Sequence, residues 1–216
     1  MSNDLEKKVM DLIGENTDTP DVFDATGIEE IRSHLNDAIE EVAMLTGCHK
    51  RVWHIPLKAD CYFYRIEYGD VGDQFGWFDS VYIVGQARVL EQDSLIGLTQ
   101  LDARWLYATG TPSRYVPLPG YRNTFIVWPA VSSSSDTLEV TGVAIPDRYI
   151  ADTDRIKLRK SFEWACVNRA VSEFWATRGD AQSAARYFQT YAQEVGYPQM
   201  YPEQYERRWQ YRTEKR

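Results

Sequence analysis

The pattern of apolar residues changes within residues 51–66, RVWHIPLKADCYFYRI. Before this stretch apolar residues recur every three to four positions, as in a helix, whereas within it they alternate as in strands. Two strand-like runs flank Lys58-Ala59-Asp60, and we expect them to form a β-hairpin around that turn. Residues 51–66 therefore separate a helical beginning of the chain from a β-rich middle.

Helical patterns lie on both sides of this middle. Before it, apolar spacing predicts a short helix over residues 5–13 and a longer one over 28–45. After it, we expect a helix from Asp152 or Thr153 through Phe174 and a final, alanine-rich helix over 181–195. Arg178-Gly179-Asp180 reads as the turn between these two, with Asp180 as the cap of the last helix.

The β-rich middle contains further strand patterns and turn signals. The expected strands are 81–89, 124–128 and 137–143, and the turn-rich stretches are 69–76, 110–119 and 132–136. Short strands at this spacing are typical of a small antiparallel sheet or sandwich.

The order of these patterns predicts the fold. A helical apolar stripe must be covered, and the stripes at the two ends of the chain are the only helical ones available to cover each other. The sequence thus predicts an α+β protein, in which N- and C-terminal helices form a helical bundle with an inserted antiparallel β subdomain and an extended C-terminal tail. The expected parts are residues 1–50, 51–150, 151–196 and 197–216.

Charge is unevenly distributed along the 216 residues, whose formal net charge is −8. Residues 1–50 carry 12 acidic and 4 basic side chains, residues 51–150 carry 11 and 8, and residues 151–216 carry 9 and 12. The acidic beginning can be neutralised by the basic end within one subunit, or the two can meet between neighbouring copies in a head-to-tail contact. The sequence leaves both arrangements open.

One side of the predicted helix 28–45 is strongly acidic. A set of acidic residues on one helix is usually a solvated face, and less commonly a docking face for a basic partner. The residues concerned are Glu29, Glu30, Asp37, Glu40 and Glu41.

Composition and termini place the chain among folded proteins outside the membrane. Hydrophobic residues make up 44% of the chain, and no apolar run approaches the ~20 residues needed to span a bilayer. The N-terminus is acidic and has no apolar run, so we expect no signal peptide and a protein made in the cytoplasm. The three cysteines fit no CxxC spacing, and we expect no disulfide.

Catalytic signatures are missing from the sequence. It contains no phosphate-binding glycine loop, nucleophile elbow, HExxH or GxGxxG, and we expect neither enzymatic activity nor a cofactor. Cys48, His49, His54 and Cys61 have the residue types of a zinc site but not its spacing, so a small zinc-dependent hydrolase is a weak alternative. His34 lies near Asp37, which we interpret as a surface pair rather than an acid–base site.

The C-terminal tail interleaves aromatic and basic residues. Such a segment can dock into a protein partner, stack on nucleic-acid bases or cover a neighbouring subunit. Because the tail carries only a small positive excess on an acidic chain, we favour a protein partner over nucleic acid. The predicted partner-binding residues are Tyr197, Tyr201, Tyr205, Arg207, Arg208, Trp209, Tyr211 and Arg212.

Several stretches together resemble the head-to-tail adaptor proteins of tailed bacteriophages. They are the helix around Asn36-Asp37-Ala38, Trp105 followed by TGTPSRY at 109–115, FIVWP at 125–129, and the alanine-rich last helix. The resemblance covers roughly residues 5–195. Its most specific part is TGTPSRY followed by FIVWP. None of these stretches is a catalytic motif.

The resemblance implies a structural virion protein. Proteins of this family form a ring, in most cases of twelve copies, that joins the portal protein to the tail or nozzle protein and passes genomic DNA through its channel without sequence-specific binding. It implies a location in the neck of the virion, with assembly in the host cytoplasm. In such proteins a C-terminal extension often grips the portal, and residues 197–216 hold that position here. A nucleic-acid-binding module that uses the tail is the main alternative.

Overall fold

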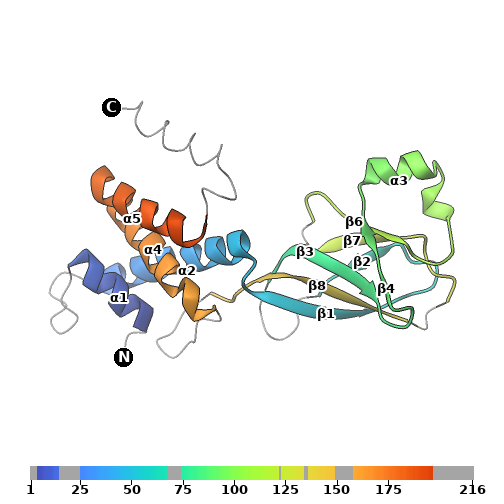
Figure 1. Cartoon of the computed structure of the whole chain (residues 1–216), viewed down its shortest axis with the longest axis horizontal. Helices are drawn as coiled ribbons and strands as arrows, with labels where there is room; N and C mark the ends of the chain where they lie inside the picture. The colour runs from blue at the N-terminus through green and yellow to red at the C-terminus, as the bar shows by residue number, and fades with distance from the viewer. Residues whose placement is uncertain are drawn as a thin grey trace. The chain divides into compact units, whose positions relative to one another are not determined.

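The computed structural model of the chain describes residues 4–14, 25–67, 74–121, 123–133, 136–148 and 158–196. Its helices and strands fall into two compact units (Figure 1). The helical unit contains α1, α2, α4 and α5, and the β unit spans His49–Asp147. The α+β class expected from the sequence is confirmed.

The helical unit is built from both ends of the chain. Its helices are α1 (Asp4–Ile13), α2 (Ala25–Thr46), α4 (Glu163–Thr177) and α5 (Ala181–Glu194). Their apolar stripes meet in one core, where side chains such as Leu35, Val171 and Tyr191 are fully buried. The hydrophobic effect favours this arrangement, because the apolar faces of all four helices are buried only when the helices from the two ends of the chain pack together.

The start of α4 differs from the prediction. Residues 149–157 lie outside the described part of the chain, but Leu158 and Arg159 are not helical, and a 3-10 turn η2 (Lys160–Phe162) precedes Glu163. Arg159 has extended backbone angles. A 3-10 turn repeats every three residues, so the spacing of Arg159 and Phe162 suits it as well as an α-helix, and the prediction placed the start of the helix too early.

The β unit contains two four-stranded sheets. Sheet A has the order β1-β8-β3-β4 and sheet B the order β2-β7-β6-β5. All neighbours are antiparallel except β5 and β6, which are parallel. The strands are β1 (Lys50–Pro56), β2 (Phe63–Arg65), β3 (Gln74–Ile83), β4 (Arg88–Val89), β5 (Glu91–Gln92), β6 (Arg114–Pro117), β7 (Thr124–Trp128) and β8 (Thr137–Ile145).

The two sheets pack face to face as a sandwich. Alternate residues of each strand point into a common core, which includes Phe78 and Val140 of sheet A and Phe125 of sheet B. The ring of Phe78 lies 5.2 Å from that of Phe125 and 5.7 Å from that of Tyr115, so aromatic contacts join the sheets.

The predicted hairpin around Lys58-Ala59-Asp60 is wrong. β1 pairs with β8, from Lys50 opposite Val143 to Pro56 opposite Thr137, whereas β2 pairs with β7 in the other sheet. The turn thus carries the chain from one sheet to the other. Alternation of apolar residues along a strand indicates which face is buried, but not which strand pairs with it. The pattern was therefore compatible both with a hairpin and with two strands in different sheets.

Several elements were not expected from the sequence. A short helix α3 (Leu95–Leu101) and a 3-10 turn η1 (Trp105–Tyr107) follow β5, and β6 lies within the stretch predicted to be turn-rich. Ser94 caps α3 by accepting a hydrogen bond from the backbone N–H of Gly97 at 3.0 Å. We call α3 and η1 together the helical cover.

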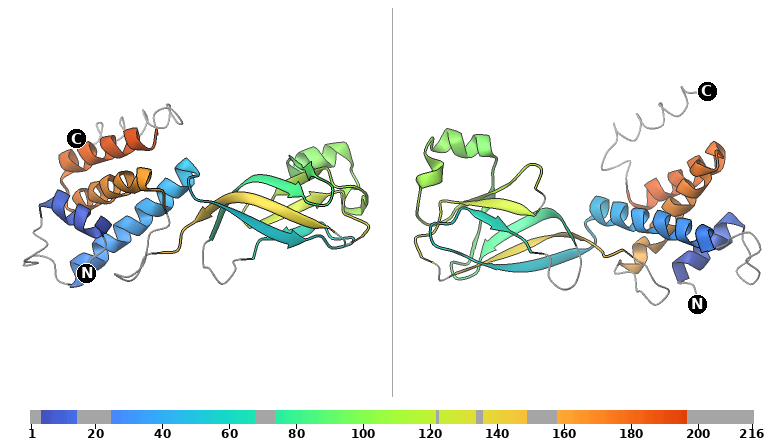
Figure 2. Two further views of the ribbon diagram at one scale, coloured as in Figure 1. Left: turned by 60° about the horizontal axis from the view of Figure 1, so that its bottom comes forward. Right: turned by 180° about the vertical axis from the view of Figure 1, so that it is seen from behind.

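The helical cover packs on the outer face of sheet B (Figure 1, Figure 2). Leu98 is fully buried against Val116 of β6 and Ile126 of β7, whose neighbours along each strand face the sandwich core. The indole N–H of Trp128 donates a hydrogen bond to the backbone carbonyl of Trp105 at 3.1 Å and fastens η1 to the sheet. The β unit therefore has three layers: helical cover, sheet B and sheet A.

Candidate interaction surfaces

The predicted partner-binding tail lies outside the described residues. Residues 197–216 include all eight side chains proposed from the sequence: Tyr197, Tyr201, Tyr205, Arg207, Arg208, Trp209, Tyr211 and Arg212. Their role as a binding segment stays a prediction. The surfaces discussed next belong to the described parts of the two units.

The acidic side of α2 is partly neutralised within its own unit. Asp37 lies 3.3 Å from Arg148, and the carboxylate of Glu41 accepts a hydrogen bond from Nε of Arg169 at 2.8 Å. Glu30 pairs with Arg178. The pairs of Glu30 and Glu41 join the acidic beginning of the chain to its basic end within one copy, so the acidic side is not simply a solvated face.

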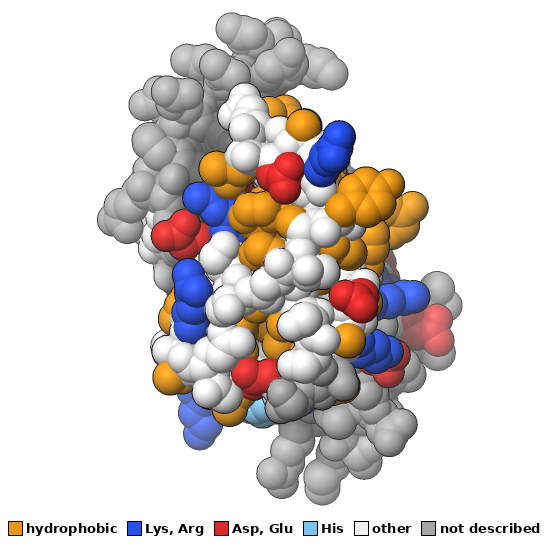
Figure 3. Space-filling view, turned by 90° about the vertical axis from the view of Figure 1, so that its right-hand side faces the viewer, with side chains coloured by type: hydrophobic (Ala, Val, Ile, Leu, Met, Phe, Trp, Pro, Cys, Tyr) orange, Lys and Arg blue, Asp and Glu red, His pale blue; other side chains and the backbone are white. Residues whose placement is uncertain are grey.

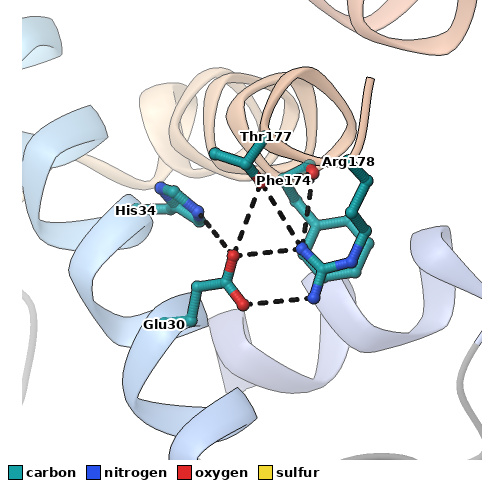
Figure 4. A network of polar contacts seen from close by, with 5 residues as sticks. All are labelled: Glu30, His34, Phe174, Thr177 and Arg178. Atoms are coloured by element: carbon teal, nitrogen blue, oxygen red, sulfur yellow. Dashed lines mark hydrogen bonds and ion pairs between the residues drawn. The ribbon is translucent and has the colours of Figure 1, made fainter. Parts of the chain in front are cut away.

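Glu30 is the centre of the most extensive of these contacts (Figure 4). Its two carboxylate oxygens accept hydrogen bonds from both terminal nitrogens of Arg178, at 3.0 and 3.1 Å, in a bidentate pair. The guanidinium carbon of Arg178 also lies 3.5 Å from the centre of the Phe174 ring. The hydrogen bond from Arg178 holds the pKa of Glu30 below its ordinary value despite opposing desolvation.

His34 belongs to the same network. Its Nε2 lies 3.5 Å from Oε1 of Glu30, whereas Asp37, the partner suggested by the sequence, pairs with Arg148. Side chains of a helix lean towards its N-terminus, so a residue reaches back four positions more readily than forward three. The surface pair of His34 with Asp37 was therefore assigned to the wrong carboxylate.

The Arg178-Gly179-Asp180 tripeptide is explained by local structure. Gly179 has a φ of +78°, in the left-handed region that favours glycine. The carboxylate of Asp180 accepts hydrogen bonds from the backbone N–H groups of Gln182 and Ser183, at 3.1 and 3.0 Å, and caps α5 as predicted. With Arg178 held by Glu30, both charged side chains of the tripeptide have structural partners.

A second polar network joins three helices of the helical unit. Arg169 of α4 binds Glu41 of α2 and also donates to Glu173, and its guanidinium lies over the rings of Phe188 and Tyr191 of α5. The hydroxyl of Tyr191 donates a hydrogen bond to Glu41 at 2.9 Å. Burial and the neighbouring carboxylate raise the pKa of Tyr191, so it stays a neutral donor. This arrangement fastens helices and presents no nucleophile.

The candidate zinc ligands do not form a cluster. Among the described residues, no three His, Cys, Asp or Glu side chains come close enough to hold a metal ion. His54 is exposed on sheet A, 3.5 Å from Glu139, and the thiol of Cys61 donates to the backbone carbonyl of Phe63 at 3.2 Å. Burial raises the pKa of the remaining thiol, Cys166, to about 12, which disfavours a reactive thiolate.

The outer face of sheet A carries apolar side chains without a cover of described residues. In an antiparallel sheet with one solvated face, polar residues normally occupy the outward positions. Here four outward side chains are apolar and 43–61% exposed. They are Val52 of β1, Trp77 of β3, Val84 after β3 and Val89 of β4, and we call them the bare face.

The helical cover also exposes apolar side chains on the side turned away from sheet B. Four of its residues are 45–82% exposed: Ile96, Leu101, Leu106 and Tyr107. Figure 3 shows hydrophobic side chains gathered towards the upper part of this end of the β unit, with few charges among them. Neither apolar surface was predicted from the sequence, although four large apolar residues between 96 and 107 outside any predicted strand were a usable signal.

A groove runs along one side of the β unit between β1 and β2. Its volume is about 410 Å3, and its lining includes Trp53, Phe63, Lys58 and Arg65. β1 and β2 are edge strands of the two sheets, so on this side of the sandwich no strand of the described residues pairs with their outer edges. The lining mixes aromatic with charged residues and shows no catalytic arrangement.

Comparison with models of protein families gives a match over nearly the whole chain. A family model described as SU10 adaptor protein matches residues 3–216, which includes both units and the C-terminal tail. The motif TGTPSRY leads into β6, to which its last two residues belong, and FIVWP contains most of β7. The two strands pair with each other beneath the helical cover. Comparison with curated protein sequences finds no match. No helix in the described residues is long and apolar enough to cross a membrane.

Proposed function

The chain belongs to the SU10 adaptor protein family of phage adaptor proteins, and from this membership we propose that it forms the ring that joins the capsid portal to the tail. We propose a ring of twelve copies in the virion neck, with genomic DNA passing through its channel. The protein acts as a connector and performs no chemical step.

The observation that carries the proposal is the extent of the family match. It begins at residue 3 and ends at residue 216, so both units and the tail belong to the shared architecture. The internal neutralisation of α2 fits a structural part, because Glu30 and Glu41 already have partners and do not need a basic ligand. The motifs that carried the resemblance form paired strands and not a catalytic site.

We assign portal binding to the tail. Residues 197–216 contain tyrosine, tryptophan and arginine, the residue types enriched at the energetic centres of protein interfaces. Holding a segment of this length in one conformation on a partner costs conformational entropy. Burial of its aromatic side chains, at about 25 cal/mol per Å2 of apolar surface, offsets that cost. Tail binding would thus order the subunit on the portal and help the ring to form there.

The proposal assigns DNA a passive role. A chain with a net charge of −8 is, as a whole, poorly suited to tight sequence-independent binding of the phosphate backbone. Arg148, Arg169 and Arg178 are each paired with a carboxylate in the helical unit. These three arginines are therefore already engaged within the subunit, which fits a chain that does not hold DNA tightly.

The test is cryo-electron microscopy of the full chain mixed with the portal protein of the same phage. We expect a closed ring on the portal with residues 197–216 in contact with portal subunits. A chain that stays monomeric and does not bind the portal would overturn the proposal.

Two sets of tail variants separate the portal from DNA as the target. Replacing Tyr205 and Trp209 by serine should weaken portal binding by about tenfold or more, as loss of interface aromatics does. The matched set, Arg207→Gln with Arg208→Gln, should affect binding less. Strong DNA binding that disappears in the glutamine set and falls steeply with salt would instead favour a nucleic-acid-binding module.

A further inference from the structure

We propose that an extended, acidic segment of a different protein binds this chain by adding as a strand to the outer edge of β1, with alternate side chains in the groove between β1 and β2. We call this edge and the groove together the edge site. The inference goes beyond the proposed function, because it adds a binding surface in the β unit that is separate from the C-terminal tail. Its occupant is defined by its chemistry, an acidic peptide in extended conformation.

The backbone of β1 presents hydrogen-bonding groups that its own sheet does not use. The carbonyl of His49, just before β1, and the N–H of Leu57, just after it, both make backbone hydrogen bonds to β8 or the residue before it, at 2.8 and 2.9 Å. Backbone groups in an antiparallel ladder point alternately to the two sides. The N–H and C=O groups of Val52 and His54 therefore point to the outer edge, where no strand of the described residues pairs with them.

β1 is better suited to receive a strand than the other edges of the two sheets. It has seven residues and spans about 23 Å, whereas β2 has three residues and β4 and β5 have two each. The carbonyl of Phe63 in β2 already accepts a hydrogen bond from the thiol of Cys61 at 3.2 Å. Pro56, at the end of β1, lies in the same outward register as His54 and marks where strand pairing would stop, because proline has no N–H to donate.

The groove beside this edge has room for the side chains of an added strand. Every second side chain of such a strand would point to the same side of sheet A as Trp53 and Ile55, which are half-buried against the sandwich core. Phe63 lines the groove from β2 and is 54% exposed. The volume of about 410 Å3 lies within the range of about 300–1,000 Å3 that is typical of binding sites. Apolar side chains at alternate positions of the occupant would remove these aromatic rings from water.

The charges around the groove favour an acidic occupant. Residues 50–66 carry four basic side chains and one acidic side chain, although the chain as a whole has a net charge of −8. Lys58 and Arg65 are exposed in the groove, and neither forms an ion pair with another residue in the described part of the chain. Glu67 is the one carboxylate among the described lining residues. A strand with Asp or Glu at its polar positions would supply the partners that these two cations lack.

The same features disfavour two other occupants. A second β1 would bring a second set of the same cations to the contact, and like charges on neighbouring strands destabilise their pairing. A nucleic-acid strand could stack on Trp53 and Phe63, but its phosphates only accept hydrogen bonds. The outward carbonyls of Val52 and His54 would then lose water without gaining a donor, whereas a peptide strand offers both donors and acceptors.

Titration with designed peptides tests the edge site in the isolated full chain. The probe is a fluorophore-labelled heptapeptide of alternating glutamate and valine, blocked at both ends, and its anisotropy reports binding. We expect saturable binding that weakens as salt rises, with slower hydrogen exchange at the amides of Val52 and His54. The lysine–valine counterpart should bind at least about tenfold more weakly. No binding, equal binding of the two peptides, tighter binding of a short oligothymidylate, or unchanged exchange at both amides would overturn the proposal.

A pair of variants at one position tests the backbone contact. His54→Pro removes an outward N–H and leaves the hydrogen bonds to β8 in place, as Pro56 does at the end of the strand. It should weaken peptide binding by about tenfold, because one carbonyl of the peptide loses its donor. His54→Thr removes the same imidazole but keeps the N–H, and should bind like the unmodified chain. Equal affinities of the two variants would exclude strand addition.

A second set of variants tests the charges and does not depend on the folding of His54→Pro. Lys58→Glu combined with Arg65→Glu should weaken binding of the glutamate peptide by at least about tenfold and remove its salt dependence. The matched control is Arg88→Glu, which reverses an exposed cation of β4 at the opposite edge of sheet A and should leave the affinity unchanged. The same loss in both would mean that only the total charge of the chain matters, and would overturn the edge site.

Photocross-linking in the virus particle identifies the natural occupant. A photoreactive phenylalanine analogue replaces Phe63 in the full chain, and linked peptides are sequenced by mass spectrometry. We expect links to a segment of a different protein in which Asp and Glu outnumber Lys and Arg. Links to another copy of this chain, including its acidic residues 15–24, links to DNA, or no links would overturn this inference. Particles with the ring but without the expected link overturn only the edge site, whereas complete necks that lack this chain overturn the proposed function.

Discussion

The outer faces of the two sheets in the β unit differ in what covers them. Sheet B is covered by α3 and η1, and its outward residues Val116 and Ile126 are buried to about the same degree as the sandwich core. Sheet A carries outward apolar residues of the same kind, yet Trp77 and Val89 stay exposed. The comparison shows that the role of outward apolar residues cannot be inferred from the strand sequence alone. They can stabilise the subunit, as in sheet B, or remain exposed and available for assembly, as in sheet A.

The largest expected effect lies beneath the helical cover. Leu98→Ala removes a fully buried side chain and leaves a cavity against sheet B, and should lower the free energy of unfolding by about 3 kcal/mol. Urea unfolding of the full chain, followed by tryptophan fluorescence, measures this. Leu101→Ala, on the exposed side of the same helix, is the matched control and should stay within about 0.5 kcal/mol. Equal losses in both variants would mean that the cover is not an inner layer of the subunit.

A smaller effect is expected where η1 is fastened to sheet B. Trp128→Phe keeps most of the apolar contact but removes the N–H that donates to the carbonyl of Trp105, and should cost about 1 kcal/mol. Hydrogen exchange of the amides of residues 105–108 should become faster in the variant. Exchange that is unchanged there would show that this hydrogen bond does not hold the cover in place.

The attachment of α3 to β6 should depend on pH. Asp93 accepts hydrogen bonds from the backbone N–H of Ser94, at 2.7 Å, and from Arg114 of β6, and these two donors hold its pKa below the ordinary value. The ionised carboxylate of Asp93 therefore contributes its full stabilisation at pH values well above about 4, the ordinary pKa of an aspartate. This stabilisation is lost as the pH falls through the lowered pKa of Asp93 in the folded chain. Asp93→Asn should lose less stability between pH 6 and pH 3 than the unmodified chain. An identical loss would assign the acid sensitivity to other carboxylates.

The smallest effect on the single subunit is expected on the bare face. Val89→Thr should change the free energy of unfolding of a monomer by no more than about 0.5 kcal/mol, because its side chain is 61% exposed. A loss above about 1.5 kcal/mol in dilute monomer would show that part of the same chain covers this face, and would remove the contrast between the sheets.

Sequence patterns predicted the elements whose signal is local. The apolar stripes gave α1, α2 and α5 within a few residues, and Asp180 was identified as a cap because its role depends only on the next three residues. The strand Thr124–Trp128 was predicted with its observed limits, since an apolar run ending at Pro129 has a clear boundary.

Features that depend on distant residues were not predictable in the same way. The partner of β1 lies more than eighty residues along the chain in β8, and nothing in the local pattern distinguishes it from β2. α3 has seven residues, too few to show a helical period, and its burial depends on Val116 and Ile126. The predicted binding tail lies outside the described residues, so its assignment still depends on composition and on the family match.

The division of the helical unit between the two ends of the chain affects how the protein is made. α2 ends at Thr46 and α4 begins at Glu163, so more than a hundred residues must be synthesised before the stripe of α2 can meet its partner. At ribosomal rates of about 5–20 residues per second, this delay is on the order of ten seconds. During it Ile31, Leu35 and Val42 have no α4 or α5 to cover them, whereas all strands of the β unit have already been made. The β unit can therefore fold first, and the nascent N-terminal helices are the segment that most needs protection from aggregation on the ribosome.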